Sequence, residues 1–167
     1  MINKINKLSK SEFTKVFANI FENSRWIAEE LYKQKPFGDF GDLSSKMMEI
    51  FEKTSKEKKL KILKDHPDLG DKTKISSLTA DSQKEQKNAG LDMCTKEEFN
   101  EFKKLNDTYK KFGFPFILAI KGKSKIEILN NFRERINSEP QIEFEEAIKQ
   151  VKKIASLRLE DLSSKNI

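Results

Sequence analysis

The sequence predicts an all-α protein, a single-domain bundle of about eight helices. Three observations lead to that prediction. Apolar residues recur with helical periodicity, only six glycines and four prolines interrupt the chain, and residues suited to begin a helix precede most periodic stretches. A chain of 167 residues can bury a hydrophobic core without disulfides or metal ions to support it. We therefore expect one domain over residues 1–167.

Local signals place the helix boundaries. Four expected helices begin with the spacing of a capping box, in which a hydroxyl residue precedes Glu by three positions. Pro140 suits the start of the last helix, and His66-Pro67 ends the fourth, because the residue before proline disfavours the helical conformation. The capping pairs are Ser9–Glu12, Thr54–Glu57, Thr95–Glu98 and Ser124–Glu127. The expected helices are 10–21, 24–34, 42–53, 55–65, 79–89, 96–111, 124–136 and 139–161.

Two further segments are placed by their composition. The stretch from Phe114 to Ile120 is apolar and β-capable, but no second strand is expected to pair with it. We expect it to be a buried extended link between helices. Both termini are polar, and we expect them to be frayed.

Composition and charge exclude several classes of protein. The net charge is +6, but 29 of the 33 cations are Lys interleaved with acids, which favours solvated helix faces over a nucleic-acid surface. The single Cys94 and the single His66 exclude a disulfide framework, a multi-cysteine metal site and any site that needs two imidazoles. No apolar run approaches the ~20 residues of a membrane span, and residues 1–20 have no signal-peptide core. We expect a cytoplasmic protein with no membrane or nucleic-acid partner.

His66 is the first residue that could carry chemistry. It is the only side chain able to supply an imidazole near neutral pH, and it lies just beyond a helix end and before Pro67. The same position allows a purely structural role, in which the ring caps the preceding helix through the dipole at its C-terminus. The sequence leaves both roles open.

A polar stripe is expected on helix 79–89. Ser82, Glu85, Gln86 and Ala89 fall at i, i+3, i+4 and i+7, so they share one helix face. If this face is buried, its hydroxyl, carboxylate and amide could hold a small ligand rich in hydrogen-bonding groups. Periodicity alone favours the alternative of an exposed polar face.

Arg158 falls inside the apolar stripe of the last helix, between Ala155 and Leu162. Where Lys is the usual cation, an Arg in such a place indicates a need for its planar, bidentate guanidinium. A buried guanidinium requires an anion or several acceptors. A structural carboxylate and the carboxylate of a ligand are both open as its partner.

Other chemical signals are absent. Cys94 has no CxxC neighbour, so we expect an inert, partly buried thiol. There is no GxSxG elbow, glycine-rich phosphate loop, HExxH motif or EF-hand pattern. These absences argue against a nucleotide or metal cofactor.

Four motifs occur in order along the chain: His66-Pro67-Asp68-Leu69-Gly70, Ser82-x-x-Glu85-Gln86-x-x-Ala89-Gly90-Leu91, Asn106-x-x-Tyr109 followed by Phe112-Gly113-Phe114-Pro115-Phe116-Ile117, and Leu157-Arg158-Leu159. This ordered set resembles the OHCU decarboxylase family, whose enzymes act on 2-oxo-4-hydroxy-4-carboxy-5-ureidoimidazoline in urate degradation. The similarity covers about residues 8–162, and the main departure is the heavy use of Lys on the surface. The stretch 132–139, with Arg135, Asn137 and Glu139, also resembles the family.

The resemblance implies an all-helical fold, a homodimer, a small-molecule substrate, and catalysis without a metal or organic cofactor. It implies that His66 and Glu85 are catalytic. The residues that it implies for substrate binding are Pro67, Ser82, Gln83, Lys84, Glu85, Gln86, Ile117, Leu118, Ala119, Ile120, Lys121 and Arg158.

The implied reaction suits these residue types. Loss of CO₂ leaves an electron pair that delocalises into the ring, and protonation on one face then gives (S)-allantoin. We expect His66 to act as the general acid–base and Arg158 or backbone N–H groups to hold substrate anions. Glu85 would orient either the ureido arm or His66, and the sequence does not decide between them.

Two alternatives compete with the decarboxylase. A J-domain co-chaperone also carries His-Pro-Asp after a basic helix, and here His66-Pro67-Asp68 follows several lysines. Against this alternative, a J-domain is about half as long, and it would leave Phe112–Phe116 and Arg158 unexplained. The second alternative is a paralogue of the decarboxylase that kept the fold and lost the activity.

Overall fold

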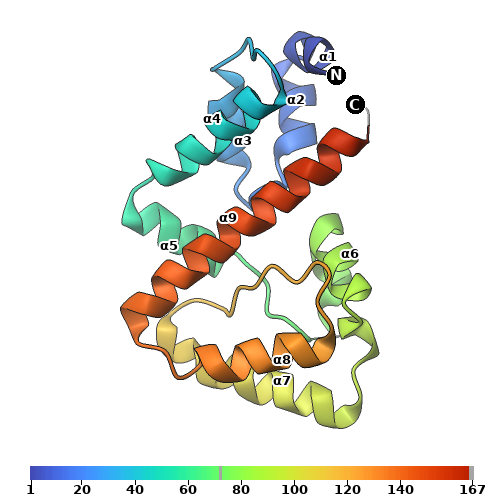
Figure 1. The fold of residues 1–167 in the computed structure, drawn as a ribbon, viewed down its shortest axis with the longest axis vertical. Helices are drawn as coiled ribbons and strands as arrows, with labels where there is room; N and C mark the ends of the chain where they lie inside the picture. Colours follow the sequence, from blue (N-terminus) through green and yellow to red (C-terminus); the bar gives the residue numbers. More distant parts are fainter. Residues whose placement is uncertain (72, 166–167) are drawn as a thin grey trace. The chain divides into compact units, whose positions relative to one another are not determined.

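A computed structural model describes residues 1–71 and 73–165 of the chain and confirms the all-α prediction (Figure 1). The described residues form nine α-helices and three short 3₁₀ turns, with no strand. None of these helices is both long and apolar enough to cross a membrane. The helices are α1 (Ile2–Lys7), α2 (Lys10–Phe17), α3 (Arg25–Tyr32), α4 (Phe40–Glu52), α5 (Lys56–Lys64), α6 (Ala80–Asn88), α7 (Lys96–Tyr109), α8 (Lys125–Arg135) and α9 (Pro140–Ser164). The 3₁₀ turns are η1 (Ile75–Ser77), η2 (Leu91–Met93) and η3 (Lys110–Phe112).

The chain divides into two compact units. The first comprises residues 1–62 together with the chain from residue 152 onward, and the second comprises residues 63–151. The helices α5 and α9 therefore each contribute residues to both units. The expectation of one domain over residues 1–167 stays a prediction.

The first unit is built around α2, α3 and α4, in which α3 packs against both of the others. Aromatic rings fill its interior: the Phe13 and Phe17 rings lie 4.5 Å apart, and those of Phe21 and Phe51 lie 4.9 Å apart. Burial of such rings is the main source of stability for a helical core.

The N-terminus corrects one expectation, because residues 2–7 form α1 instead of a frayed end. The Ile5 side chain is fully buried, and the Asn6 amide forms two hydrogen bonds with the backbone of Phe37, of 2.8 and 2.9 Å. These long-range contacts stabilise a helix that is too short to form alone.

Several helix boundaries differ from the prediction, and two of these differences have a visible cause. The first expected helix, 10–21, ends at Phe17. Ile20 and Phe21 are buried, as their apolar pattern indicates, but they lie in the turn that follows the helix. The cap of α5 is Ser55, whose hydroxyl accepts from the Lys58 amide, whereas Thr54 donates to a carbonyl of α4. The other three capping boxes are present as predicted.

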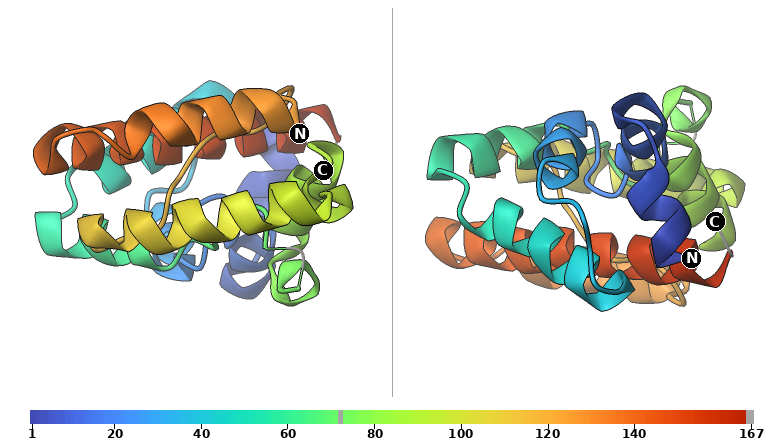
Figure 2. Two further views of the ribbon diagram at one scale, coloured as in Figure 1. Left: turned by 90° about the horizontal axis from the view of Figure 1, so that it is seen from below. Right: turned by 90° about the horizontal axis from the view of Figure 1, so that it is seen from above.

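The second unit contains α7 and α8, which pack together and run in the same direction (Figures 1 and 2). The chain must therefore travel back along α7 before α8 begins. The 14 residues of α7 span about 21 Å at ~1.5 Å per residue, a length that six or seven extended residues can cover. Residues 115–120 have no regular secondary structure and are mostly buried, which confirms the predicted extended link.

A polar network fixes this link inside the second unit. The Arg135 guanidinium donates to the Ile117 carbonyl at 2.6 Å and to Glu143 at 2.9 Å, and the Tyr109 hydroxyl donates to the same oxygen of Glu143. Burial, reinforced by the Glu143 carboxylate, raises the pKa of Tyr109. The Phe116 ring of the link stacks on Phe132 of α8 at 3.9 Å.

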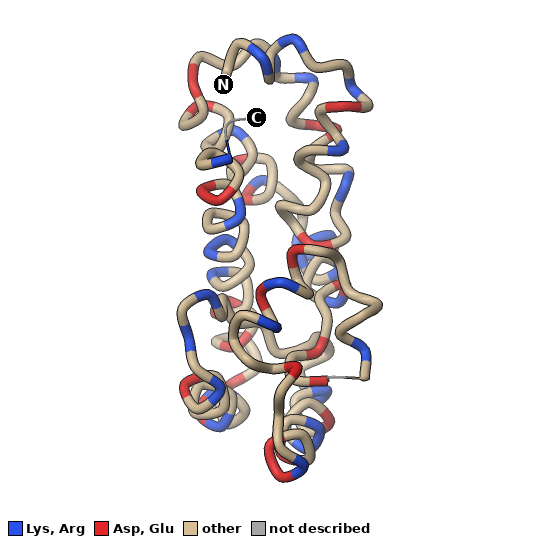
Figure 3. Tube along the Cα trace, turned by 90° about the vertical axis from the view of Figure 1, so that its right-hand side faces the viewer, with Lys and Arg blue, Asp and Glu red and all other residues tan. Residues whose placement is uncertain are grey.

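Charges of both signs are interspersed along the trace (Figure 3). Many form short-range pairs on one helix, such as Arg25–Glu29 and Lys46–Asp42. The basic residues are therefore not segregated from the acids along the helices.

Candidate functional site

The loop that carries His66 begins where α5 ends. α5 stops at Lys64, and the His66 amide donates to the Leu63 carbonyl at 3.2 Å, closing the last turn. Pro67 prevents the helix from continuing. The His66 side chain is half-buried, so the ring is neither sealed in the core nor fully in water.

Gly70, further along this loop, has a left-handed conformation that favours glycine. Its φ is +74°, and a Cβ atom at this position would lie 2.4 Å from the Phe102 ring of α7. The absence of a side chain lets the loop approach α7 closely. The loop therefore packs closely against α7 at Gly70.

Two amide side chains hold the backbone of the loop between these ends. Gln86 of α6 accepts from the Gly70 amide and donates to the Asp68 carbonyl, both at 3.2 Å. Asn106 of α7 donates to the Leu69 carbonyl at 2.9 Å. Three consecutive loop residues are therefore bonded to side chains from two helices.

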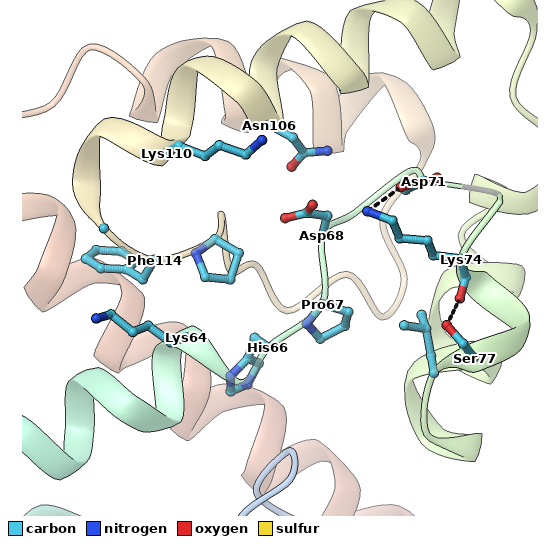
Figure 4. Close-up of a pocket in the computed structure, with 13 residues that line it drawn as sticks. Lys64, His66, Pro67, Asp68, Asp71, Lys74, Ser77, Asn106, Lys110 and Phe114 are labelled. Atoms are coloured by element: carbon cyan, nitrogen blue, oxygen red, sulfur yellow. Dashed lines mark hydrogen bonds and ion pairs between the residues drawn. The ribbon is translucent and has the colours of Figure 1, made fainter.

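A cavity of about 530 Å³ opens beside this loop (Figure 4). In Figure 4, Asp68 lies between His66 and Pro67 on one side and Asn106 and Lys110 on the other. A second cavity of about 330 Å³ shares part of this wall, including Asp68 and Asn106. The larger cavity is lined by Lys64, His66, Pro67, Asp68, Asp71, Lys74, Ser77, Leu78, Asn106, Lys110, Gly113, Phe114 and Pro115.

Two lysines of the cavity lining, Lys74 and Lys110, form ion pairs. Lys74 lies 3.1 Å from Asp71, and Lys110 lies 2.7 Å from Asp107. Burial would raise the pKa of Asp71, but hydrogen bonds from Thr73 and Lys74 hold it below its ordinary value. A hydrogen bond to Asp107 raises the pKa of Lys110. The Lys110 ammonium therefore stays charged at neutral pH, in a cavity that also contains the only imidazole of the chain.

The predicted polar stripe lies on a buried face of α6. Ser82 and Gln86 are 4% and 2% exposed, and Glu85 is half-buried. The Gln83 amide donates to the carbonyls of Ser76 and Leu78, and Lys84 is exposed. The alternative of a solvent-exposed polar face is wrong, because two polar members of the stripe are buried.

Of the predicted backbone wall, Ile117–Lys121, the first four residues belong to the extended link and Lys121 lies in the turn that follows it. The Ala119 amide donates to Gln150 at 3.0 Å, and the Ile117 carbonyl accepts from Arg135. Of the predicted site residues, the cavity lining contains His66 and Pro67. Its described lining does not include residues 82–86 or 117–121.

Arg158 lies in the first unit and is 7% exposed, as the apolar stripe indicates. Its guanidinium donates to Glu22 at 2.9 Å and to the Asn19 carbonyl at 2.7 Å. Of the two partners left open by the sequence, the structure contains the structural carboxylate. A direct contact between Arg158 and substrate stays a prediction.

No site role was predicted for Asn106, Lys110 or Lys74, and Asp68 was considered only for the J-domain alternative. A signal for Asn106 was available: it shares the buried face of α7 with Phe102 and Tyr109, so it is an amide inside an apolar stripe. The lysines carried no such signal in a chain with 29 of them.

Cys94 is buried, as expected, and its thiol donates to the Leu91 carbonyl. Among the described residues, no group of three or more His, Cys, Asp or Glu side chains could hold a metal ion.

Comparisons with known sequences connect these features to one family. The OHCU decarboxylase family profile matches residues 6–160. The uric acid degradation bifunctional protein of Bacillus sp. (strain TB-90) is 43% identical over 96% of this chain and 32% of its own length. The 2-oxo-4-hydroxy-4-carboxy-5-ureidoimidazoline decarboxylase of Halalkalicoccus jeotgali is 37% identical over 97% of this chain and 91% of its own. The chain thus spans about a third of the bifunctional relative and nine-tenths of the shorter one.

Solved structures give the same result. The crystal structure of an (S)-allantoin synthase has a TM-score of 0.77 and 29% identity, over 97% of this chain and 53% of that one. The crystal structure of an OHCU decarboxylase in the presence of (S)-allantoin has a TM-score of 0.68 and 26% identity, over 83% of this chain and 91% of that one.

Proposed function

This chain belongs to the OHCU decarboxylase family, and from that membership we propose that it converts 2-oxo-4-hydroxy-4-carboxy-5-ureidoimidazoline to (S)-allantoin in urate degradation. The observation that carries the proposal is the family match over residues 6–160, which includes all four motifs found in the sequence. The half-buried His66 at the edge of a cavity supports it.

The proposed chemistry needs a proton carrier and placed donors. The bond between the ring carbon and the carboxylate breaks, CO₂ leaves, and the electron pair passes into the adjoining ring. A proton is then added to one face of the ring, which sets the S configuration. His66 is the proposed general acid–base, since imidazole titrates near neutral pH and no second histidine exists.

The remaining site residues would bind and orient the substrate. We assign Pro67 to contact with the substrate, the α6 segment Ser82–Gln86 to its ureido and ring groups, and the backbone of Ile117–Lys121 to the pocket wall. Glu85 orients either the ureido arm or His66. Arg158 or backbone N–H groups stabilise the substrate anion and the charge that develops as CO₂ leaves.

We also propose that the protein is a cytoplasmic homodimer, as the family resemblance implies. The mass of one chain is 19.5 kDa. A sedimentation mass of that value at micromolar concentration would contradict the dimer.

The proposed function predicts that His66→Asn abolishes turnover in a folded protein. General acid–base catalysis typically accelerates a reaction by about 10²–10⁴-fold, so the turnover rate of the variant should fall by at least that factor. The measurement generates the substrate in situ from urate with urate oxidase and hydroxyisourate hydrolase. Ultraviolet absorbance then follows its decay, and circular dichroism follows the handedness of the allantoin, with and without the protein.

Each outcome of that assay decides something. Faster decay with one-handed allantoin, lost in His66→Asn, supports the decarboxylase and its acid–base residue. An active His66→Asn variant overturns the acid–base role of His66 but leaves the decarboxylase proposal standing. Unaccelerated decay with racemic product from a well-folded wild-type sample overturns the function and supports the inactive paralogue. Stimulation of a chaperone ATPase, lost in Asp68→Asn, would instead support the J-domain alternative.

A further inference from the structure

Asn106 is a buried amide whose two polar atoms have different surroundings. Its side chain is nine-tenths buried on the inner face of α7. The Nδ2 group donates to the Leu69 carbonyl at 2.9 Å, whereas Oδ1 is buried with no hydrogen-bond partner among the described residues. Exchanging the two atoms would place two acceptors against each other, so only this orientation gives the loop a hydrogen bond.

The unpartnered oxygen argues against a role in packing alone. A buried acceptor without a partner opposes folding, because it gives up its hydrogen bonds to water. A leucine, whose side chain branches in the same way, would extend the apolar stripe formed by Phe102 and Tyr109 and would remove that penalty. The amide has an N–H donor that leucine lacks, and this donor forms the hydrogen bond to the Leu69 carbonyl of the loop.

The bonded carbonyl lies three residues from His66. Leu69 is 7% exposed and is followed by Gly70, which the Phe102 ring of the same helix touches closely. A loop bonded at this point is anchored to α7, and the backbone from His66 to Leu69 has less freedom to rotate. The direction in which the imidazole points therefore depends on this anchor.

We propose that Asn106 is a positioning residue: through the Leu69 carbonyl it holds the loop so that His66 faces its cavity. The inference rests on the proposed function, because His66 is the group that it places. Asn106 acts through the backbone and not on the substrate. Misplacement of a catalytic group by about 1 Å can cost ~10²-fold in rate, so a loosened loop should lower kcat.

The test uses two substitutions that remove the donor in different ways. Asn106→Leu removes both polar atoms, and Asn106→Asp keeps the shape and an acceptor. The matched control is Asn137→Asp, because the Asn137 amide also donates to a backbone carbonyl, that of Arg133, but from an exposed position. We expect both Asn106 variants to lower kcat by about 10–100-fold with KM within about twofold, and Asn137→Asp to leave both constants unchanged.

A second readout does not depend on activity. The untagged chain has one histidine, so its imidazole gives a single set of ring C–H signals in a ¹³C–¹H correlation spectrum. At a pH where the ring is neutral, these signals should shift or broaden in both Asn106 variants and stay in place in Asn137→Asp. Far-UV circular dichroism on the same samples shows whether each variant is folded.

The outcomes separate this inference from the proposed function. Unchanged ring signals in a folded Asn106 variant overturn the inference, as does an increase confined to KM, which would indicate direct substrate contact. A wild-type protein without decarboxylase activity overturns the proposed function, while the ring signals still decide whether Asn106 positions His66. Should Asn106→Leu fail to fold, the isosteric Asn106→Asp decides.

Discussion

The sequence did not predict that the acidic partners of Arg158 and Arg135 are buried. Arg158 was found because it interrupts an apolar stripe, but Glu22, its 2%-exposed partner, lies in a turn where no periodicity predicts burial. Glu143, the partner of Arg135, lies in the first turn of α9, where an exposed acid is ordinarily expected to complement the helix dipole. The burial of Glu22 and Glu143 thus depends on tertiary contacts, which cannot be inferred from the periodicity of the sequence.

The Arg158–Glu22 pair gives a prediction about the role of Arg158. Arg158→Met alone removes the guanidinium that pairs with the buried Glu22 carboxylate, so the free energy of unfolding should fall by about 3–5 kcal/mol. Adding Glu22→Gln removes the negative charge of that carboxylate, and most of the lost free energy of unfolding should be recovered. Urea unfolding of the wild type, both single variants and the double variant measures this coupling.

Activity of the double variant then separates the two partners left open by the sequence. We expect it to be stable but nearly inactive, because the family resemblance implies that Arg158 also contacts substrate. If turnover returns along with stability, Arg158 serves only to pair with Glu22, and backbone N–H groups must hold the substrate anion. A fully stable Arg158→Met would contradict the first part of the argument.

At the scale of elements, local chemistry predicted most helices well. Three capping boxes and the proline at the start of α9 lie where the sequence placed them. The errors have tertiary causes: α1 forms because Ile5 is buried, and α2 ends early although Ile20 and Phe21 continue its apolar pattern. Periodicity reports which residues are buried, but not whether a helix or a turn buries them.

The candidate site shows the same division. The position of His66 before a proline, the polar stripe of α6 and the extended link were all predictable from local pattern. The bonds from Gln86 and Asn106 to residues 68–70 were not, because they join segments 16 to 37 positions apart. The contact between Gly70 and Phe102 likewise exists only once the loop and α7 are folded together.

At the scale of the whole molecule, two helices connect the units. Of the 25 residues of α9, those up to Val151 belong to the second unit and the rest to the first; α5 is likewise shared. Isolated helices shorter than about 12–15 residues are marginal in water, so the part of α9 left by an unfolded unit would lose support. Unfolding of one unit should therefore destabilise the other.

We accordingly predict one cooperative unfolding transition for the whole chain. Trp26 lies in the first unit and is the only tryptophan, so its fluorescence reports on that unit, whereas far-UV circular dichroism reports on the helices of both. The two urea curves should coincide, with one midpoint and one slope, as expected for two-state unfolding. A fluorescence transition that precedes or follows the dichroism would mean that the units unfold independently, and residues 63–151 would then count as a separate domain.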